Sequence, residues 1–271
     1  MMVSPLLAKA APTGRDIVNV TPARAGWRHV GFRALRLAEG EIETVHTADR
    51  ELCIVVLTGM VDVTVDGRKH ERLGTRDSVF DGVSPAAVYV PTGKTVEIRA
   101  AREAEVALCS APGDGQLRHT RVMDPAGMKR SVRGQGSNTR YVCDILPHDD
   151  PTAAHLLVVE VITPAGHSSS YPPHKHDVEQ APVETQLEET YYHRLNPPQG
   201  FAFQRVYTDD RSLDEACAVE NHDVVMVPRG YHPVVAPHGY DLYYLNVMAG
   251  PNRFWVFRND PAHEWMLAPQ A

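Results

Sequence analysis

The chain has 271 residues, a formal net charge of −7 at pH 7 and a hydrophobic content of 43%. This length suits one large domain or two domains of modest size, and the hydrophobic content suffices for an ordinary packed core, which excludes disorder over most of the chain. The acidic balance, without a visible basic stripe, disfavours nucleic acid as a partner, because phosphate binding requires clustered Lys and Arg. No run of about 18 apolar residues occurs, so neither a membrane span nor a membrane partner is expected.

The beginning of the chain and the cysteine pattern predict where in the cell the protein is found. The apolar stretch near the N-terminus is too short and too broken for the core of a signal peptide. The four cysteines are scattered without a close pair, which is typical of free thiols in a reducing compartment; they are Cys53, Cys109, Cys143 and Cys217. We therefore expect a cytoplasmic protein.

Glycine and proline divide the chain into short segments rich in Val, Ile, Leu and Tyr, which are typical of β-strands. In chain order, the clearest segments are residues 52–57, 61–65, 86–90, 156–162, 201–207, 224–227 and 242–247. The second of these alternates between apolar and polar residues and ends at Asp66-Gly67, which indicates a hairpin. No long amphipathic helix is present, although residues 212–218 could form one or two helical turns. Many short strands predict an all-β sandwich or barrel.

A weak internal repeat indicates two similar β units. Val-Pro-x-Gly follows an apolar run at residues 90–93 and again at residues 227–230, and a Glu precedes a strand in each half, at Glu51 and Glu189. We interpret residues 1–120 and 121–271 as two tandem units. Thr95 in the first unit matches His232 in the second, so the first unit is expected to lack a metal site and to have a structural role.

Residues that could bind a metal are concentrated in the second half. His174 and His176 are two residues apart, so in a strand both imidazoles point to the same face. His232 follows a Pro/Gly turn, and Glu189 opens an apolar strand, although Glu188 remains an alternative. Three imidazoles and one carboxylate suit Zn²⁺, Mn²⁺ or Fe²⁺ and leave coordination positions for a substrate. We therefore predict one divalent metal ion per chain, in the second unit.

The order of these motifs resembles the cupin superfamily: His-x-His, then Glu before a strand, then Pro-x-Gly-x-His. The chain departs from that pattern because Glu189 lies 13 residues after His176, which implies a loop insertion. The resemblance to the 5-deoxy-glucuronate isomerase family is more specific and covers the whole chain. It rests on Tyr-Pro-Pro-His-Lys-His-Asp, Leu-Glu-Glu-Thr-Tyr-Tyr-His-Arg, Gly-Phe-Ala-Phe-Gln-Arg-Val-Tyr-Thr-Asp-Asp and Val-Pro-Arg-Gly-Tyr-His-Pro-Val.

This resemblance implies two tandem cupin barrels and a metal-dependent aldose–ketose isomerase of bacterial inositol catabolism. The implied reaction converts 5-deoxy-D-glucuronate to 2-deoxy-5-keto-D-gluconate, with Zn²⁺ or Mn²⁺ as the cofactor and no nicotinamide or flavin. We also expect a homo-oligomer. The alternatives are the related 4-deoxy-5-hexosulose-uronate ketol-isomerase, a cupin dioxygenase, and a sugar-binding cupin without catalytic activity.

An isomerase of this kind needs a base that moves a proton between neighbouring carbons. The sequence leaves this role open among Glu189, Tyr191, Tyr244 and Lys175. A carboxylate substrate also calls for a guanidinium group, which binds with two parallel hydrogen bonds. Arg205 and Arg229 lie near the motifs and are the expected substrate-binding residues, with Arg205 predicted to share an inward face with Phe201 and Phe203.

Overall fold

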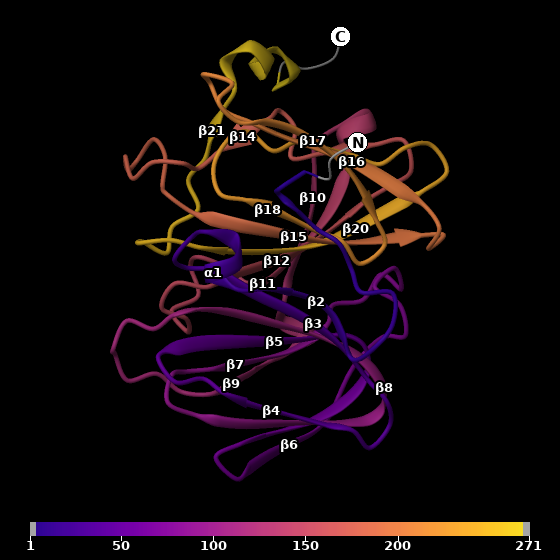
Figure 1. The fold of residues 1–271 in the computed structure, drawn as a ribbon, viewed down its shortest axis with the longest axis vertical. Helices are drawn as coiled ribbons and strands as arrows, with labels where there is room; N and C mark the ends of the chain where they lie inside the picture. Colours follow the sequence, from indigo (N-terminus) through magenta and orange to yellow (C-terminus); the bar gives the residue numbers. More distant parts are fainter. Residues whose placement is uncertain (1–3, 268–271) are drawn as a thin grey trace.

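The computed structural model describes residues 4–267, and they form two β units stacked along the long axis of the molecule (Figure 1). Helical structure among these residues is limited to a short α-helix and three 3-10 segments; they are α1 (Pro22–Ala25), η1 (Pro125–Gly127), η2 (Gly136–Asn138) and η3 (Pro261–Leu267). This confirms the all-β prediction. In the described residues no helix is both long and apolar enough to cross a membrane.

The first unit is one eight-stranded sheet with the order β2-β3-β8-β5-β7-β9, in which β4 pairs with β8 and β6 with β5. Its strands are β2 (Asp16–Val20), β3 (Gly31–Leu37), β4 (Ile42–His46), β5 (Arg50–Val65), β6 (Arg68–Leu73), β7 (Ala86–Val90), β8 (Thr95–Pro112) and β9 (Arg121–Met123). The pairing of β5 with β8 shifts register repeatedly, and such bulges bend long strands. Different parts of β8 can therefore pair with β3 and with β4 around one apolar interior.

The second unit contains a seven-stranded sheet with the order β1-β18-β15-β20-β12-β11-β10, a four-stranded sheet with the order β13-β19-β16-β17, and the pair β14-β21. Its strands are β1 (Leu7–Ala8), β10 (Lys129–Arg133), β11 (Arg140–Leu146), β12 (Leu157–Thr163), β13 (Ser168–Ser169), β14 (His174–Lys175), β15 (Glu188–Asn196), β16 (Phe201–Tyr207), β17 (Asp214–Glu220), β18 (Val224–Val227), β19 (Val234–Val235), β20 (Asp241–Ala249) and β21 (Arg258–Asn259). The two larger sheets enclose a second apolar interior.

The predicted strands agree with the observed ones because local alternation and turn residues specify them. The β5–β6 hairpin turns at Asp66 and Gly67, which both have positive φ (47° and 82°), as a tight two-residue hairpin requires. One local expectation was wrong: residues 212–218 are not helical, and most of them belong to strand β17. Pairing with β16 along its full length stabilises this extended conformation more than local helix propensity could.

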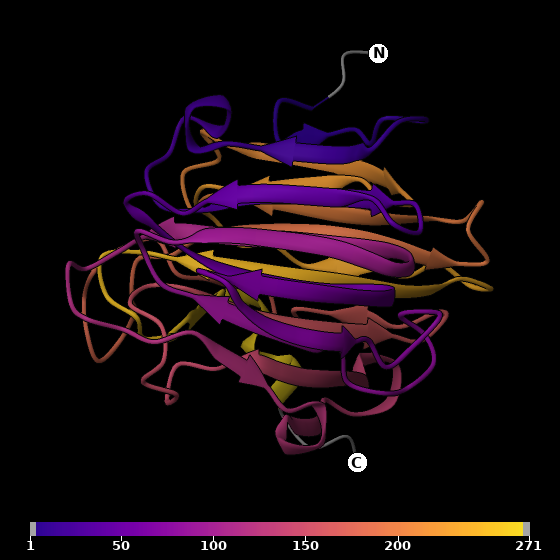
Figure 2. The ribbon, with the colours of Figure 1, turned by 90° about the horizontal axis from the view of Figure 1, so that it is seen from below.

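A third apolar cluster joins the two units. It contains residues of β3 and β5 from the first unit and of β15, β18 and β20 from the second. The ring centroids of Phe32 and Tyr192, for example, lie 5.3 Å apart across this contact. Figure 2 shows the strands of the two units layered over one another, running in similar directions. Each fully buried large apolar side chain stabilises this contact by about 1.5–3 kcal/mol.

The sheets do not divide the chain at one position. Strand β9 still pairs with β7 of the first unit, and the chain enters the second unit's sheet at Lys129. Strand β1 belongs to the second unit, since Leu7 and Ala8 pair with Val225 and Val224. The domain division at residue 120 stays a prediction.

Candidate metal site and cavity

Strand β15 carries Glu189 in the middle of the larger sheet of the second unit. Glu189 pairs with Val227 of β18 and with Met248 of β20, so its backbone is held on both sides. The tight turn after β18 then brings His232 to the same place. Gly230 in this turn has a φ of 96°, and a Cβ there would lie 2.6 Å from the Tyr207 carbonyl oxygen, so glycine is required.

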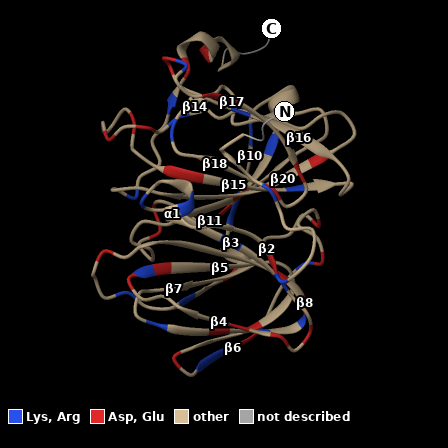
Figure 3. Cartoon of the chain, in the orientation of Figure 1, with Lys and Arg blue, Asp and Glu red and all other residues tan. Residues whose placement is uncertain are grey.

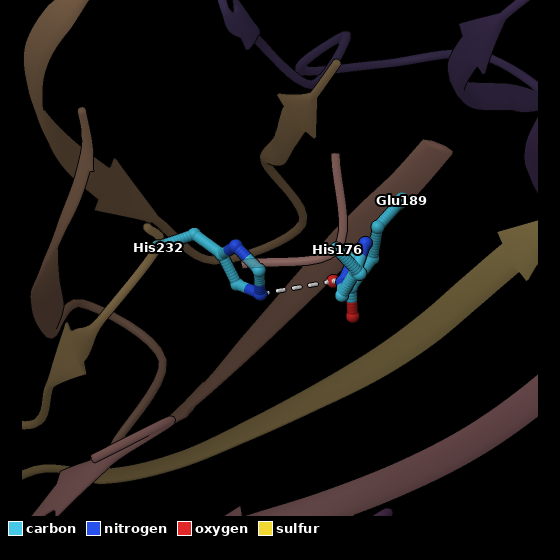
Figure 4. Close-up of side chains that lie close together, drawn as sticks. All are labelled: His176, Glu189 and His232. Atoms are coloured by element: carbon cyan, nitrogen blue, oxygen red, sulfur yellow. Dashed lines mark hydrogen bonds and ion pairs between the residues drawn. The ribbon is translucent and has the colours of Figure 1, made fainter. Parts of the chain in front are cut away.

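Three predicted ligands meet in the buried interior (Figure 4). Nε2 of His176 lies 3.0 Å from Oε2 of Glu189, and Nε2 of His232 lies 3.2 Å from the same oxygen. Two ligand atoms that each lie about 2.1 Å from one ion are separated by roughly 3.0–3.4 Å. The observed separations therefore fit a shared metal ion.

The hydrogen bonds of the two Nδ1 atoms show which ring nitrogen of His176 and of His232 faces Glu189. Nδ1 of His176 lies 2.9 Å from the Leu187 carbonyl oxygen, and Nδ1 of His232 lies 2.8 Å from the Gly230 carbonyl oxygen. A carbonyl oxygen can only accept a hydrogen bond, so each Nδ1 carries a hydrogen, and Nε2 is the ring atom that faces the carboxylate. Within residues 4–267, the buried Nε2 of His232 has no hydrogen-bond partner. Such a cluster of electron-rich atoms requires a cation.

Burial and the contacts between Glu189 and the histidines determine the pKa values in this cluster. Burial by itself raises the pKa of Glu189, but the contacts with His176 and His232 outweigh it and hold that pKa at about 2. Burial lowers the pKa of His176, and the Glu189 carboxylate outweighs this effect and raises the pKa above its usual value. A proton on His176 can therefore serve as the cation when no metal ion is bound.

His174 lies beside this cluster rather than inside it. Its ring centroid is 4.8 Å from that of His232, 6.3 Å from that of His176 and 4.5 Å from that of Phe257. Burial, and then the neighbouring His232 and His176 rings, hold the pKa of His174 well below its usual value. The imidazole is thus neutral near neutral pH, which is the form that binds metals.

A cavity of about 270 Å³ adjoins the cluster at His174. Its polar lining includes Tyr191, Tyr244, Asn246, Arg133 and Arg140. Tyr191 also packs against the ligand His232, with ring centroids 5.7 Å apart. A small molecule in the cavity would therefore lie beside His174 and Tyr191, next to the ligand cluster.

The two tyrosines expected as catalytic candidates both lie in this cavity. The Tyr191 hydroxyl is hydrogen-bonded to Oγ of Ser170 at 3.0 Å, and the Tyr244 hydroxyl is hydrogen-bonded to Oγ of Ser169. Burial raises the pKa of both phenols. Both tyrosines thus keep their protons near neutral pH and can donate hydrogen bonds to a substrate oxygen.

Lys175 does not reach the cavity. It alternates with His174 and His176 along the chain and so points to the opposite face. Its Nζ lies 2.5 Å from Asp209 and 5.4 Å from the centre of the Tyr231 ring. The structure therefore does not bring Lys175 to the ligand cluster.

The expectation for Arg205 is corrected by the geometry of β16. Phe201, Phe203 and Arg205 do share a face, but it is the outer one, because the intervening Ala202, Gln204 and Val206 are buried. The Arg205 guanidinium forms two 2.7 Å hydrogen bonds with Asp214 on the neighbouring strand. Arg229 is also exposed, with Oγ of Ser212 at 3.5 Å. Neither arginine lines the cavity.

The two adjacent glutamates of β15 point in opposite directions. The Glu188 carboxylate accepts hydrogen bonds from the backbone N–H groups of Arg28, His29 and Val30 in the first unit, at 2.8, 2.7 and 3.0 Å. It cannot reach the histidines that surround Glu189. Of the two glutamates that the sequence left as alternatives, Glu189 lies beside the histidines and Glu188 does not.

The cavity residues that the sequence-based prediction missed include Asn246, Arg133 and Arg140. Asn246 lies two residues after Tyr244 on β20, so strand alternation could have revealed it. The two arginines lie at the facing ends of β10 and β11. No sequence signal pointed to these arginines, because only the pairing of β10 with β11 brings them together.

Positive and negative side chains are interspersed over both units (Figure 3). The ligand cluster differs from this mixed surface, because its one carboxylate, Glu189, is buried and lies beside the imidazoles of His176 and His232. Its residues come from separate elements: a segment after β14, the start of β15 and the turn after β18. The fold is thus what assembles the ligands.

Comparison with known proteins agrees with this geometry. Residues 6–266 match the model of the KduI/IolB family. The chain is 53% identical to a 5-deoxy-glucuronate isomerase from Halalkalibacterium halodurans and 52% identical to one from Bacillus subtilis, with 92% of each chain covered in both cases. It is 50% identical to the same enzyme from Geobacillus kaustophilus, over 93% of this chain and 91% of the relative.

Two solved structures define the fold further. An IolB-like protein from Salmonella typhimurium superimposes with a TM-score of 0.94 at 47% identity, covering 97% of this chain and 99% of that one. Oxalate decarboxylase from Bacillus subtilis superimposes with a TM-score of 0.64 at 14% identity, covering 96% and 80%, which shows a common fold. The prediction of two tandem cupin barrels is confirmed. The chain belongs to the KduI/IolB family.

Proposed function

We propose that this protein is a metal-dependent aldose–ketose isomerase that converts 5-deoxy-D-glucuronate to 2-deoxy-5-keto-D-gluconate in inositol breakdown. The relatives at about 50% identity over nearly the whole chain bear the name of this activity. The structural observation that carries the proposal is the buried cluster of His176, Glu189 and His232 beside a cavity with tyrosine and arginine side chains in its lining. The same relatives favour this reaction over the related hexosulose-uronate isomerisation, a dioxygenase reaction and sugar binding without catalysis.

In this proposal His176, Glu189 and His232 hold one divalent ion, and His174 completes the set from the cavity side. Nitrogen and oxygen donors of this kind suit Zn²⁺ or Mn²⁺. When bound, the ion supplies Lewis-acid stabilisation of the negative charge that develops on the substrate oxygens. The Nδ1 hydrogen bonds to Leu187 and Gly230 keep the ligand rings oriented.

Tyr191, Tyr244 and Glu189 have separate roles in the proton transfer. The Tyr191 and Tyr244 phenols keep their protons, so they donate hydrogen bonds to the aldehyde and hydroxyl oxygens of the substrate. Glu189 is the candidate with a carboxylate, whereas the two phenols keep their protons. We assign to Glu189 the removal of the proton from the carbon next to the aldehyde and its return to the aldehyde carbon.

The test combines metal analysis with an isomerase assay. The purified protein should contain about one Zn²⁺ or Mn²⁺ per chain and should convert 5-deoxy-D-glucuronate. Chelation followed by dialysis should abolish conversion, and adding back each ion separately should identify the one that restores it. Full activity in protein that retains less than about a tenth of its metal would contradict the metal-dependent mechanism.

We also propose a cytoplasmic location. All four cysteines lie within the described residues, are buried and are unpaired, as expected in a reducing compartment. The expected homo-oligomer, and the expected lack of nucleic-acid and membrane partners, stay predictions.

A further inference from the structure

Two arginines face each other on the wall of the cavity. Arg133, the last residue of β10, is the direct register partner of Arg140, the first residue of β11, and both line the cavity beside His174. Like charges directly opposite each other destabilise a sheet unless another charge neutralises them. The pair therefore indicates an anion that binds in the cavity.

Among residues 4–267, Arg140 has no carboxylate partner, and Arg133 has only a distant one. Arg140 forms no ion pair there, and its Nη1 donates a hydrogen bond to the Asn138 carbonyl oxygen at 3.1 Å. The carboxylate nearest to Arg133 is Asp144, at 3.7 Å, and the Arg133 guanidinium lies 5.5 Å from the centre of the Trp255 ring.

Other enclosed arginines of this protein have more partners than Arg140: Arg253 and Arg50 donate several hydrogen bonds, mainly to backbone carbonyl oxygens, and two others pair with carboxylates. Arg76 forms two hydrogen bonds with Glu160, at 2.9 and 2.8 Å, and Arg194 forms one with Glu105, at 2.7 Å. A buried guanidinium without such a partner is costly, since its desolvation is not compensated. In keeping with this, burial lowers the pKa of Arg140, partly opposed by the nearby Tyr244 phenol.

The side chain of Arg140 points to the interior of the second unit. It shares a face with Val142, two residues further along β11, and Val142 belongs to the apolar interior of that unit. Strands β15, β20, β12 and β11 are consecutive in the sheet, and the register offsets Arg140 from Glu189 along the strands as well, since Tyr141 aligns through Ile162 and Tyr243 with Arg194. The cavity bridges this separation, because its lining runs from Arg140 to His174 beside the ligand cluster.

The loop between the two strands is shaped around Arg140. Gly134 has a φ of 80°, and a Cβ at this position would lie 2.1 Å from the Asn138 carbonyl oxygen and 2.6 Å from Nη1 of Arg140. The loop can therefore close over the guanidinium only with glycine here. This arrangement holds Arg140 in place before any ligand binds, which is a feature of binding sites.

We propose that Arg140, assisted by Arg133, binds the carboxylate of the uronate substrate and thereby directs its aldehyde end towards His176, Glu189 and His232. A guanidinium and a carboxylate form two parallel hydrogen bonds, so Arg140 is a specificity-determining residue. The inference rests on the proposed function and names the group that selects its substrate. It replaces Arg205 and Arg229 in this role.

The experiment compares two substrates that differ at one end. Arg140→Met, Arg140→Lys and Arg133→Met are assayed on 5-deoxy-D-glucuronate and on 5-deoxy-D-glucose, which has a primary alcohol in place of the carboxylate. Arg130→Met is the matched control, because Arg130 lies on the same strand as Arg133 but is exposed. The measured quantity is the ratio of kcat/KM for the acid to kcat/KM for the alcohol.

Arg140→Met should lower this ratio by about 30-fold or more, chiefly by loss of activity on the acid. Arg140→Lys should lower it less, because an ammonium keeps the charge without the paired hydrogen bonds. Arg133→Met should have a smaller effect, and Arg130→Met none. An unchanged ratio in Arg140→Met, or an equal loss on both substrates, would overturn the proposal.

Two further measurements separate this inference from the proposed function. Metal content should be unchanged in Arg140→Met, and adding guanidinium ion to an Arg140→Gly variant should restore part of the activity on the acid alone. If the wild-type enzyme keeps its activity without metal, the metal-dependent mechanism fails while the substrate ratio still reports on Arg140. If the wild-type enzyme requires metal but the acid-to-alcohol ratio is unchanged in Arg140→Met, only the role of Arg140 is rejected.

Discussion

Glu51 and Glu188 occupy equivalent positions in the two units, and each carboxylate accepts three consecutive backbone N–H groups of the opposite unit. The register defines the equivalence: Leu52 pairs with Val90, as Glu189 pairs with Val227, before matching Val-Pro turns. Glu51 accepts hydrogen bonds at 2.7 Å from the backbone of Ala154, His155 and Leu156. Glu188 binds residues 28–30 of the first unit in the same way.

This relationship corrects the repeat as inferred from sequence. The repeat in the sequence matches Glu51 with Glu189, but the structural counterpart of Glu189 is Leu52. The first unit therefore has an apolar residue where the second has a metal ligand, and Thr95 where the second has His232. Its glutamate instead binds the second unit.

We expect Glu51→Gln and Glu188→Gln to lower the free energy of unfolding by about 1–3 kcal/mol each, because a neutral amide is a weaker acceptor for three N–H groups. Chemical denaturation measures this change. Glu97→Gln is the control, since Glu97 is exposed on β8. Equal stability of all three variants would show that the reciprocal hydrogen bonds do not join the units.

His176→Ala and His232→Ala should each abolish isomerase activity and reduce the bound metal to near zero, with the β-sheet circular dichroism spectrum preserved. The reason is that both supply a buried ligand atom, while the apolar interiors hold the barrels together. His174→Ala should weaken metal binding less, since His174 lies at the edge of the cluster. His119→Ala, an exposed histidine, serves as the control. Unfolded or insoluble ligand variants would assign the cluster a structural role.

Metal binding should release protons near neutral pH. The Glu189 carboxylate raises the pKa of His176 against the effect of burial, so the metal-free protein holds a proton there that a metal ion must displace. Metal affinity should therefore fall as the pH is lowered through this raised pKa. Calorimetric titration with Zn²⁺ in buffers of different ionisation enthalpy counts the released protons. An affinity that does not vary between about pH 6 and 8 is incompatible with this protonation state.

The cysteines should be inert in the folded protein. Burial raises the pKa of Cys53 to about 12 and that of Cys143 to about 11, and it also raises the pKa values of Cys109 and Cys217. Since the thiolate is the reactive form, a thiol reagent at pH 8 should label almost none of the four before denaturation and all four afterwards. Rapid labelling of the native protein would indicate that the interiors open.

Several features of this protein could be predicted from its sequence because they depend on neighbouring residues. Alternation and turn residues specified the strands, as in the hairpin at Asp66-Gly67. The spacing of His174 and His176, the Pro/Gly turn before His232 and the family resemblance indicated the ligand cluster, and the structure brings His176, Glu189 and His232 together.

The tertiary structure alone decided which face of each strand looks inward. Strand alternation groups Phe201, Phe203 and Arg205, but the direction of the group depends on the sheet against which β16 packs, and that sheet comes from distant segments. The same reason separates Glu188 from Glu189, because the first unit provides the N–H groups that bind Glu188. The position of Arg140 in the cavity likewise follows from the order of β11, β12, β20 and β15 in the sheet, which no local pattern encodes.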